Sequence, residues 1–302
     1  MILGEFSPPA PYDFGLTARL MGRYHGVLDH YTHGELRRAL RFADGQLALL
    51  GVRSRGTPDA PLLEVSLLSG EVPPLENALQ KVEHLIGVGM PIHDFYTRVG
   101  DDAAMQRIIA PLYGLHHFQS ETVFEALVQV IIEQQISLKS ALRAQAAIAE
   151  WGGQGMDYAG EMVYAFPTPK QFANATPDEL HAVLKITRRR VALIQHLAQQ
   201  ISDGALNLEA LHGQSSASIY QALHTIKGIG HWTIAWTLLR GLNRVEYAGH
   251  NDVALRDAVG YFFLNQDARA SVEITEQTFA RYTPYSGLAA FYTLMHWATL
   301  HY

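Results

Sequence analysis

The feature that most constrains the fold is a change of hydrophobic periodicity at Pro73-Pro74. Before it, residues 36–70 show short apolar runs separated by turn residues, including 43–46, which predicts two or three antiparallel strands with helices around them. After it, apolar residues recur at spacings of three and four as far as the C-terminus, which predicts a series of short helices. We therefore expect a mainly α protein in which a small α/β unit precedes a larger helical body, and not a doubly wound nucleotide-binding fold. The expected helices cover residues 75–86, 101–110, 121–134, 138–150, 189–202, 215–224, 231–240, 252–260, 274–281 and 287–301.

Composition narrows the class of protein further. The chain has 302 residues, of which 48% are hydrophobic and none is cysteine. This is the composition of a folded protein with two or three compact units. The lack of cysteine excludes disulfides, thiol nucleophiles, cysteine-type zinc sites and a cysteine-ligated iron–sulfur cluster. Residues 1–14 lack the basic and apolar regions of a signal peptide, and no stretch approaches a membrane span, so we expect a cytoplasmic protein.

The charge balance argues against one way of binding nucleic acid. Lys and Arg number 23 against 29 Asp and Glu, which gives a net charge of −6, and no part of the chain is basic overall. A protein that held DNA mainly by neutralising many phosphates should be basic. Either nucleic acid is not the partner, or backbone amides and a few well-placed cations hold it.

Residues 226–233, IKGIGHWT, contain two glycines between an expected helix end and an expected helix start. Gly228 and Gly230 allow positive φ and keep side chains out of a tight hairpin. Backbone N–H groups beside a helix N-terminus suit a phosphate oxygen without requiring Lys or Arg. Taken alone, the motif equally fits an ordinary turn between two helices.

Three further side chains stand out near this motif. Asp252 begins a new helix after the hairpin helix, where an Asp is most commonly an N-cap acceptor. Trp232 and Trp236 are four residues apart and share one helix face, which fits either a core or a binding pocket. The histidines show no metal-ligand spacing, so we assign no metal site built from side chains.

In combination, IKGIGHWTIAW followed by HND at 250–252 resembles the helix-hairpin-helix DNA glycosylase superfamily. Residues 123–137 and 166–198 are similar to further segments of this superfamily. RYTPYSGLA at 281–289 is similar to a motif of its alkylpurine branch, the bacterial 3-methyladenine DNA glycosylase II type, and residues 8–20 match the amino-terminal domain of that branch. The resemblance implies an N-terminal α/β domain over 1–115, with an antiparallel sheet and linking helices. A helical glycosylase domain would cover 116–302, with its hairpin at 226–230.

The resemblance also implies an activity and a site. The expected enzyme is a monofunctional glycosylase of base excision repair, which flips alkylated purines such as 3-methyladenine and 7-methylguanine out of DNA and hydrolyses them off, leaving an abasic site. Asp252 would be the catalytic carboxylate, and Trp232 stands where strand-nicking relatives carry a lysine. The other implied residues are Trp232, Trp236 and Tyr285 in the base pocket, Gln135 as the wedge that fills the vacated stack, and Lys227, Gly228, Gly230 and Thr233 on DNA.

The implied partner is double-stranded DNA containing damaged bases, met by a monomer that associates with the nucleoid during repair. The implied cofactors exclude an iron–sulfur cluster and allow a structural Na⁺ or K⁺ ion on the backbone carbonyls of His224, Ile226 and Ile229. Lys139, Arg143, Lys185 and residues 188–190 flank the expected DNA-facing loops and are candidate phosphate contacts.

Some residues depart from the family pattern, and alternatives stay open. Val253 replaces an aromatic residue, Ser286 an arginine and Asn251 an acid, and Gln135 is polar where the wedge is apolar. Gln135 could equally be a helix-end residue that bonds the backbone. The same fold could act on 8-oxoguanine or a deaminated base, or serve as a non-catalytic hairpin module that recognises damaged DNA.

Overall fold

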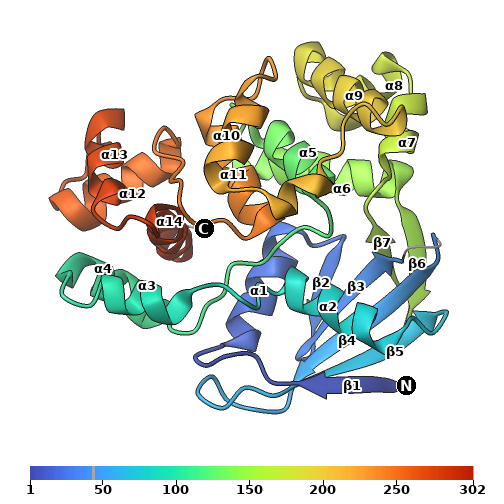
Figure 1. The fold of residues 1–302 in the computed structure, drawn as a ribbon, viewed down its shortest axis with the longest axis horizontal. Coiled ribbons are helices and arrows are strands. Elements are labelled where there is room, and N and C mark those ends of the chain that lie inside the picture. Colours follow the sequence, from blue (N-terminus) through green and yellow to red (C-terminus); the bar gives the residue numbers. More distant parts are fainter. Residues whose placement is uncertain (43–44, 302) are drawn as a thin grey trace.

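The computed structural model describes residues 1–42 and 45–301 (Figure 1). Its strands are β1 (Ile2–Phe6), β2 (Asp29–Thr32), β3 (Glu35–Arg41), β4 (Leu47–Ser54), β5 (Leu63–Gly70), β6 (Gln154–Tyr158) and β7 (Glu161–Ala165). Its helices are α1 (Phe14–Tyr24), α2 (Leu75–Leu85), α3 (Ile92–Arg98), α4 (Ala103–Ile109), α5 (Val123–Glu133), α6 (Leu138–Gly152), α7 (Pro169–Asn174), α8 (Pro177–Leu184), α9 (Arg188–Ser202), α10 (Ser216–His224), α11 (His231–Leu242), α12 (Val253–Leu264), α13 (Val272–Ala280) and α14 (Ser286–His301), with short 3-10 turns η1 (Ala110–Leu112) and η2 (Glu209–Gly213).

The N-terminal sheet is antiparallel, with strand order β1-β5-β4-β3-β2. Strands β3, β4 and β5 occupy the predicted region and confirm the antiparallel prediction. The predicted number of strands is too low for the whole sheet, because β1 and β2 extend it at both edges. Both are too short, at five and four residues, to show a clear alternation. The expected turn at 43–46 includes Ala43 and Asp44, which lie outside the described residues.

One face of this sheet packs against α1 and α2. Leu36 and Leu40 of β3 share a buried cluster with Met21 of α1 and Val82 of α2. Side chains two residues apart on a strand point to the same face. Arg38, which lies between the two leucines, is therefore carried into the same interior and is only 3% exposed.

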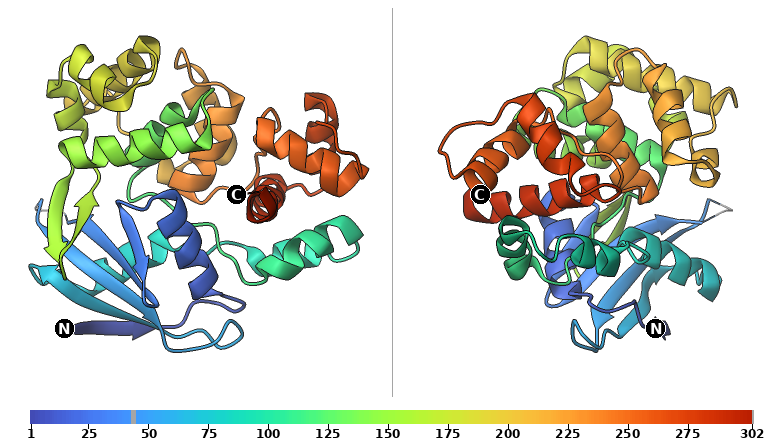
Figure 2. Two further views of the ribbon diagram at one scale, coloured as in Figure 1. Left: turned by 180° about the vertical axis from the view of Figure 1, so that it is seen from behind. Right: turned by 60° about the vertical axis from the view of Figure 1, so that its left-hand side comes forward.

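The other face of the sheet carries an element that the periodicity did not predict. We expected helices throughout the chain after Pro73-Pro74, but β6 and β7 form a hairpin that packs against this face, where Val163 joins Ala39 and Leu49 (Figure 2). Ala159 and Gly160 connect the two strands, both with positive φ. Such a two-residue turn suits a β-hairpin. The Ala-Gly dipeptide is a weaker signal of it than Asn-Gly.

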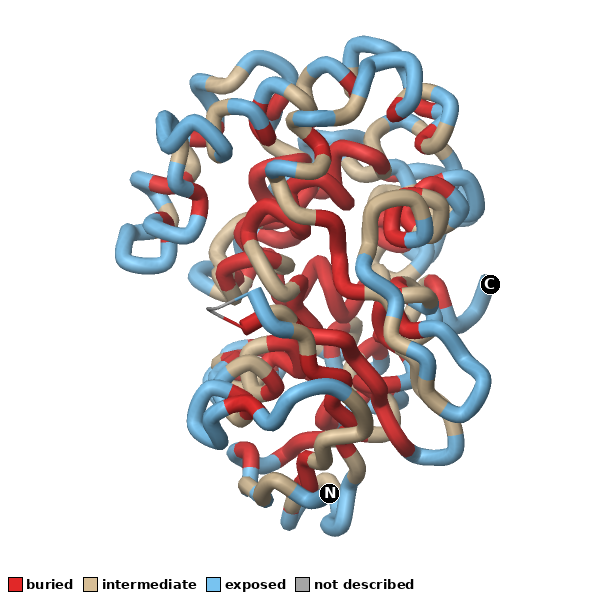
Figure 3. Tube along the Cα trace, turned by 90° about the vertical axis from the view of Figure 1, so that its right-hand side faces the viewer, coloured by how far each residue is buried: buried red, intermediate tan, exposed pale blue. Residues whose placement is uncertain are grey.

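The predicted helices are confirmed at α2, α4, α5, α6 and α9 to α14, with ends that shift by a few residues. Helices α1, α3, α7 and α8 were not among the predicted ranges. Figure 3 shows where the chain is buried. The buried hydrophobic residues form two main clusters: one joins the sheet, α1 to α4, α12, α13, α14 and part of α11, and the other joins α5 to α11. In the described part of the chain, no helix is long and apolar enough to cross a membrane. A cleft between the two clusters is where the candidate site lies.

Candidate active site

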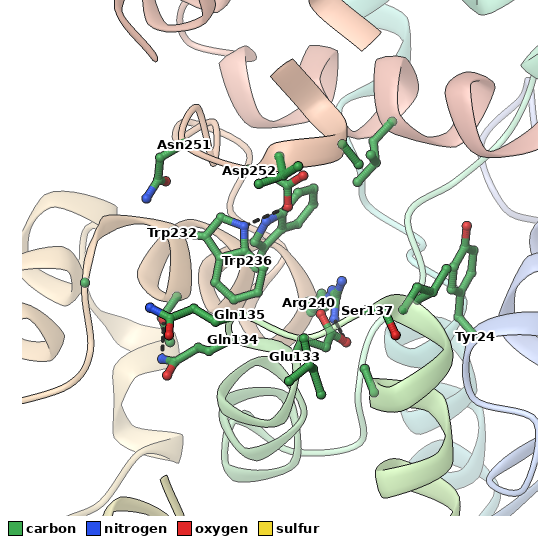
Figure 4. A pocket seen from close by; sticks show the side chains of 18 of the residues that line it. Tyr24, Glu133, Gln134, Gln135, Ser137, Trp232, Trp236, Arg240, Asn251 and Asp252 are labelled. Carbon is green, nitrogen blue, oxygen red and sulfur yellow. Dashed lines mark hydrogen bonds and ion pairs between the residues drawn. The ribbon is translucent and has the colours of Figure 1, made fainter. Parts of the chain in front are cut away.

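A cavity of about 800 Å³ opens between the two clusters. Its walls come from the loop between α5 and α6, the hairpin between α10 and α11, the inner face of α11, the start of α12 and the side of α14. This volume is typical of a small-molecule binding site. The sequence-predicted residues that line it are Gln135, Lys227, Gly228, Gly230, Trp232, Thr233, Trp236 and Asp252 (Figure 4).

The two glycines have different roles in the hairpin: Gly228 adopts a positive φ, and Gly230 leaves the surface free of a side chain. Gly228 has φ +102, a region that side chains rarely adopt, and a Cβ there would lie 3.1 Å from Leu193. Gly230 has φ −105 and is the N-cap of α11, so the predicted left-handed conformation is wrong for this residue. No atom lies within 4 Å of where its Cβ would be. The N–H groups of residues 231–233 have no acceptor in the preceding turn of the helix, so the hairpin presents free donors at an uncluttered surface.

Gln134, the C-cap residue of α5, forms two hydrogen bonds with the hairpin. Its Nε2 donates to the carbonyl oxygen of Gly228 at 3.2 Å and to Oγ1 of Thr233 at 2.9 Å. The Thr233 side chain is buried, and its hydroxyl oxygen accepts this bond within the protein. Gln135 follows with φ +54 and an exposed side chain on the cavity rim. A positive φ at a residue other than glycine is uncommon and is often found at functional positions.

Asp252 is the carboxylate of the cavity wall. Oδ1 accepts the N–H of Leu255 at 2.9 Å, which makes Asp252 the N-cap of α12. Oδ2 accepts the indole N–H of Trp232 at 2.8 Å. Burial raises the pKa of the Asp252 carboxyl above its ordinary value, and the negative charge of Glu133 adds to the rise. The two hydrogen bonds lower the pKa and so oppose the effect of burial. Ionisation of Asp252 at the cavity therefore costs free energy, but the carboxyl group can still ionise.

The two tryptophans take their places because a glycine leaves room for them. A Cβ at Gly249 would lie 2.9 Å from Nε1 of Trp236 and 3.4 Å from Cδ1 of Trp232. Trp236 is only 3% exposed, and the guanidinium of Arg240 lies 5.4 Å from the centre of its indole. Sequence reasoning missed Gly249, for which a glycine three residues before the Asp is the only signal.

Tyr285 is not brought together with the other predicted pocket residues. It does not line the cavity among the described residues, and its ring lies 6.4 Å from that of Phe95 on α3. The residue directly precedes α14, and its side chain packs as part of the core cluster that contains α3 and α14.

An ion pair that the sequence did not reveal also lines the cavity. Oε1 of Glu133 accepts from Nη1 of Arg240 at 2.6 Å and from Nε2 of Gln145 at 2.9 Å (Figure 4). The Glu133 and Arg240 side chains are 15% and 19% exposed. They join the end of α5 to α11 and face the same space as Asp252.

The three arginines at the start of α9 divide between internal and exposed positions. Arg190 donates to the carbonyl oxygens of Gln134 at 2.5 Å and Ile132 at 3.2 Å, so it fixes the end of α5. Arg188 pairs with Asp178 at the surface. Arg189 is exposed and lines the cavity mouth, which leaves it as the arginine of the three best placed for a phosphate.

With the hairpin, the capping carboxylate and the cavity in place, the class of protein can be stated. A family model described as HhH-GPD superfamily base excision DNA repair protein matches residues 128–284, and the chain belongs to this superfamily.

Individual relatives place the chain more closely. It is 33% identical over 140 residues to DNA-3-methyladenine glycosylase 2 of Escherichia coli, covering 46% of this chain and 48% of the relative. It is 29% identical over 161 residues to DNA-3-methyladenine glycosylase of Bacillus subtilis, covering 53% of each chain. The chain thus spans about half the length of the curated relatives it matches. A 3-methyladenine DNA-glycosylase structure from Archaeoglobus fulgidus has the same fold, with a TM-score of 0.82 at 22% identity over 96% of this chain and 97% of that one.

Proposed function

We propose that this chain is a monofunctional DNA glycosylase that everts alkylated purines from duplex DNA and hydrolyses their N-glycosidic bond, leaving an abasic site. The observation that carries the proposal is Asp252, an ionisable carboxylate on the wall of a cavity of about 800 Å³ that is large enough for a purine, beside the backbone N–H groups at the start of α11. Membership of a base excision repair superfamily and similarity to glycosylases named for 3-methyladenine support it.

The chemistry needs an anion near the sugar. When the N-glycosidic bond breaks, its electron pair leaves with the base and positive charge develops on the sugar, before a water molecule adds to C1′. A fixed carboxylate stabilises that charge without having to reorganise. The hydrogen bonds from Trp232 and Leu255 fix the direction of the Asp252 carboxylate. Because alkylated purines such as 3-methyladenine and 7-methylguanine are already electron-poor leaving groups, a separate strong acid is not required.

The same cavity suits an electron-poor base. An aromatic face attracts a cation with about 0.5–2 kcal/mol, more when water is excluded. Trp232 supplies such a face beside the carboxylate, and the buried Trp236, which already carries the Arg240 guanidinium, forms the wall behind it. Recognition by aromatic rings and one fixed anion would favour alkylated purines over neutral bases.

DNA would be held mainly by main-chain donors of the hairpin, with Lys227 and Arg189 as the nearby cations and Gln135 filling the vacated stack. This mode of binding is compatible with a net charge of −6. A Na⁺ or K⁺ ion on the carbonyls of His224, Ile226 and Ile229 would stiffen the turn. The Ile226 carbonyl already accepts the Ile229 N–H at 3.0 Å, but a carbonyl oxygen has a second lone pair to offer.

The proposal is tested by the products formed from methylated duplex DNA. The full chain should release free 3-methyladenine and 7-methylguanine, and strand breaks should appear only after alkali, because Trp232 offers no amine for a Schiff base. Chromatography of the released bases and denaturing gels with and without alkali measure both results. Breaks without alkali would contradict the monofunctional mechanism. Excision from an 8-oxoguanine duplex without release of methylated bases would assign a different lesion.

The pH profile should report Asp252. Because the pKa of this carboxyl is raised, the ionised form that the reaction needs is lost at a higher pH than for an exposed Asp, whose pKa is about 3.9. We expect single-turnover excision to fall as pH decreases through this raised pKa. In Glu133→Gln the acid limb should move to lower pH, because the neighbouring negative charge is gone. Single-turnover rates at saturating enzyme measure the shift, and an acid limb unchanged in Glu133→Gln would contradict the assignment.

A further inference from the structure

The Glu133–Arg240 pair offers the cavity one unused acceptor. Both hydrogen bonds that Glu133 receives, from Arg240 and Gln145, end on Oε1. In the part of the chain that the structure describes, no donor is bonded to Oε2. The side chain is 15% exposed and lines the cavity, so its open oxygen has access to whatever occupies this space.

The pair also holds this oxygen in place. Arg240 reaches Glu133 from α11 and Gln145 reaches it from α6, so three helices fix one carboxylate. The Arg240 guanidinium in turn lies over the Trp236 ring. A carboxylate held by two hydrogen bonds keeps its direction, which is a requirement for reading a ligand by hydrogen bonds.

We infer that Glu133 is a base-recognition residue that accepts hydrogen bonds from the N–H edge of an everted purine and favours guanine derivatives over adenine derivatives. This inference rests on the proposed function and names the substrate class within it. The edge of 7-methylguanine carries two adjacent donors, N1–H and the N2 amino group, which one carboxylate oxygen can accept together. The amino group of 3-methyladenine stands between ring nitrogens that are acceptors, whose lone pairs face the carboxylate unfavourably.

Replacing the Glu133 carboxylate by an amide should therefore shift the preference from 7-methylguanine toward 3-methyladenine. Glu133→Gln keeps the size of the side chain and replaces one acceptor oxygen by a donor. An amide matches an edge that has a donor beside an acceptor, which is the adenine pattern. Both methylated bases occur in the same methylated DNA, so the ratio of their release rates is measured within one sample. Effects on folding, DNA binding or the charge of Asp252 act on both bases and cancel in that ratio.

We expect the ratio of 7-methylguanine to 3-methyladenine release to fall about tenfold in Glu133→Gln, as for loss of a hydrogen bond to a charged acceptor. Glu150→Gln, an exposed exchange on α6 outside the cavity, is the matched control and should leave the ratio unchanged. Gln145→Leu removes one of the two hydrogen bonds to Glu133, at a position outside the cavity. This variant tests whether Glu133 serves only to hold the helices together.

The outcomes separate the inference from the function it rests on. If Glu133→Gln and Gln145→Leu both slow the two bases equally, Glu133 only ties α5 to its neighbours and the inference is overturned. If the unaltered chain releases neither base, the proposed function itself fails and the inference fails with it. If the ratio of 7-methylguanine to 3-methyladenine release falls in Glu133→Gln alone, the result supports both the inference and the proposed function.

Discussion

Asp252→Asn should reduce release of methylated bases by at least about 100-fold, because it removes the anion that stabilises the developing charge on the sugar. The substitution also affects the orientation of the group. The Asn oxygen can still accept the N–H of Leu255, whereas its amino group would face the Trp232 indole N–H, donor against donor. Single-turnover release from methylated DNA at saturating enzyme measures the chemical step without the contribution of binding.

The fold should survive this change, which makes the loss interpretable. Asn caps a helix about as well as Asp, and it removes a carboxylate whose pKa is raised by burial. A raised pKa means that ionisation of Asp252 costs stability at neutral pH and that the cost disappears at low pH. We expect the free energy of unfolding to stay within about 1 kcal/mol of the unaltered chain. Asp267→Asn, at an exposed loop position after α12, is the control. Undiminished release by Asp252→Asn would reject the assigned carboxylate.

Much of this site was accessible from sequence because its signals are local. The hairpin glycines, the capping Asp and two tryptophans four residues apart all lie within 25 residues, from Gly228 to Asp252. Local spacing on short helices translates almost directly into a shared surface. The helix predictions succeeded for the same reason, since each rests on a periodicity within one segment.

The parts that escaped prediction depend on contacts between distant segments. Glu133 and Arg240 are 107 residues apart, and nothing in either neighbourhood indicates that they meet. Gln134 lies in the segment 123–137, for which the sequence shows only a resemblance, but its side chain bonds to a hairpin residue 94 positions further along the chain. Tyr285 is a different case: a motif predicts it in the pocket, and in the structure its ring lies 6.4 Å from that of Phe95. Periodicity cannot report such pairings, because it reflects one element at a time.

The largest expected loss of stability lies away from the cavity, at the link between the sheet and the helical body. Glu125 of α5 accepts two hydrogen bonds from Arg38 of β3, at 2.8 and 2.9 Å, and Asp29 accepts a third at 3.3 Å. All three side chains are at most 3% exposed. Removing Glu125 leaves the buried Arg38 charge with Asp29 as its remaining bonded carboxylate, at 3.3 Å. Glu125→Leu should therefore lower the free energy of unfolding by about 3–5 kcal/mol.

A double-mutant cycle shows whether the network, and not the site alone, carries this effect. In Arg38→Met/Glu125→Leu no uncompensated Arg38 charge remains, and Asp29 keeps its bond to His25 at 3.0 Å. We expect the double variant to lose less stability than the sum of the two single variants. Asp178→Asn breaks an exposed ion pair with Arg188 and should leave the urea midpoint nearly unchanged. Strictly additive losses would contradict a coupled network.

The same variants should reveal how the two parts of the chain unfold. All four tryptophans lie on helices, at 151, 232, 236 and 297, so their fluorescence follows those helices, although Trp236 shares a buried cluster with the sheet. Far-UV circular dichroism also records the N-terminal sheet. While the Arg38–Glu125 bond is intact, the two signals should follow one urea transition, because the buried charges cannot separate without solvation. In Glu125→Leu the transitions should diverge, since the buried bonds from Arg38 to α5 are lost and only the remaining contacts join the sheet to the helices, among them apolar packing, the β6–β7 hairpin and the bond from the Arg41 N–H to Glu121. Coincident transitions in this variant would mean that those contacts suffice, and that the ion pair adds stability without coupling the two parts.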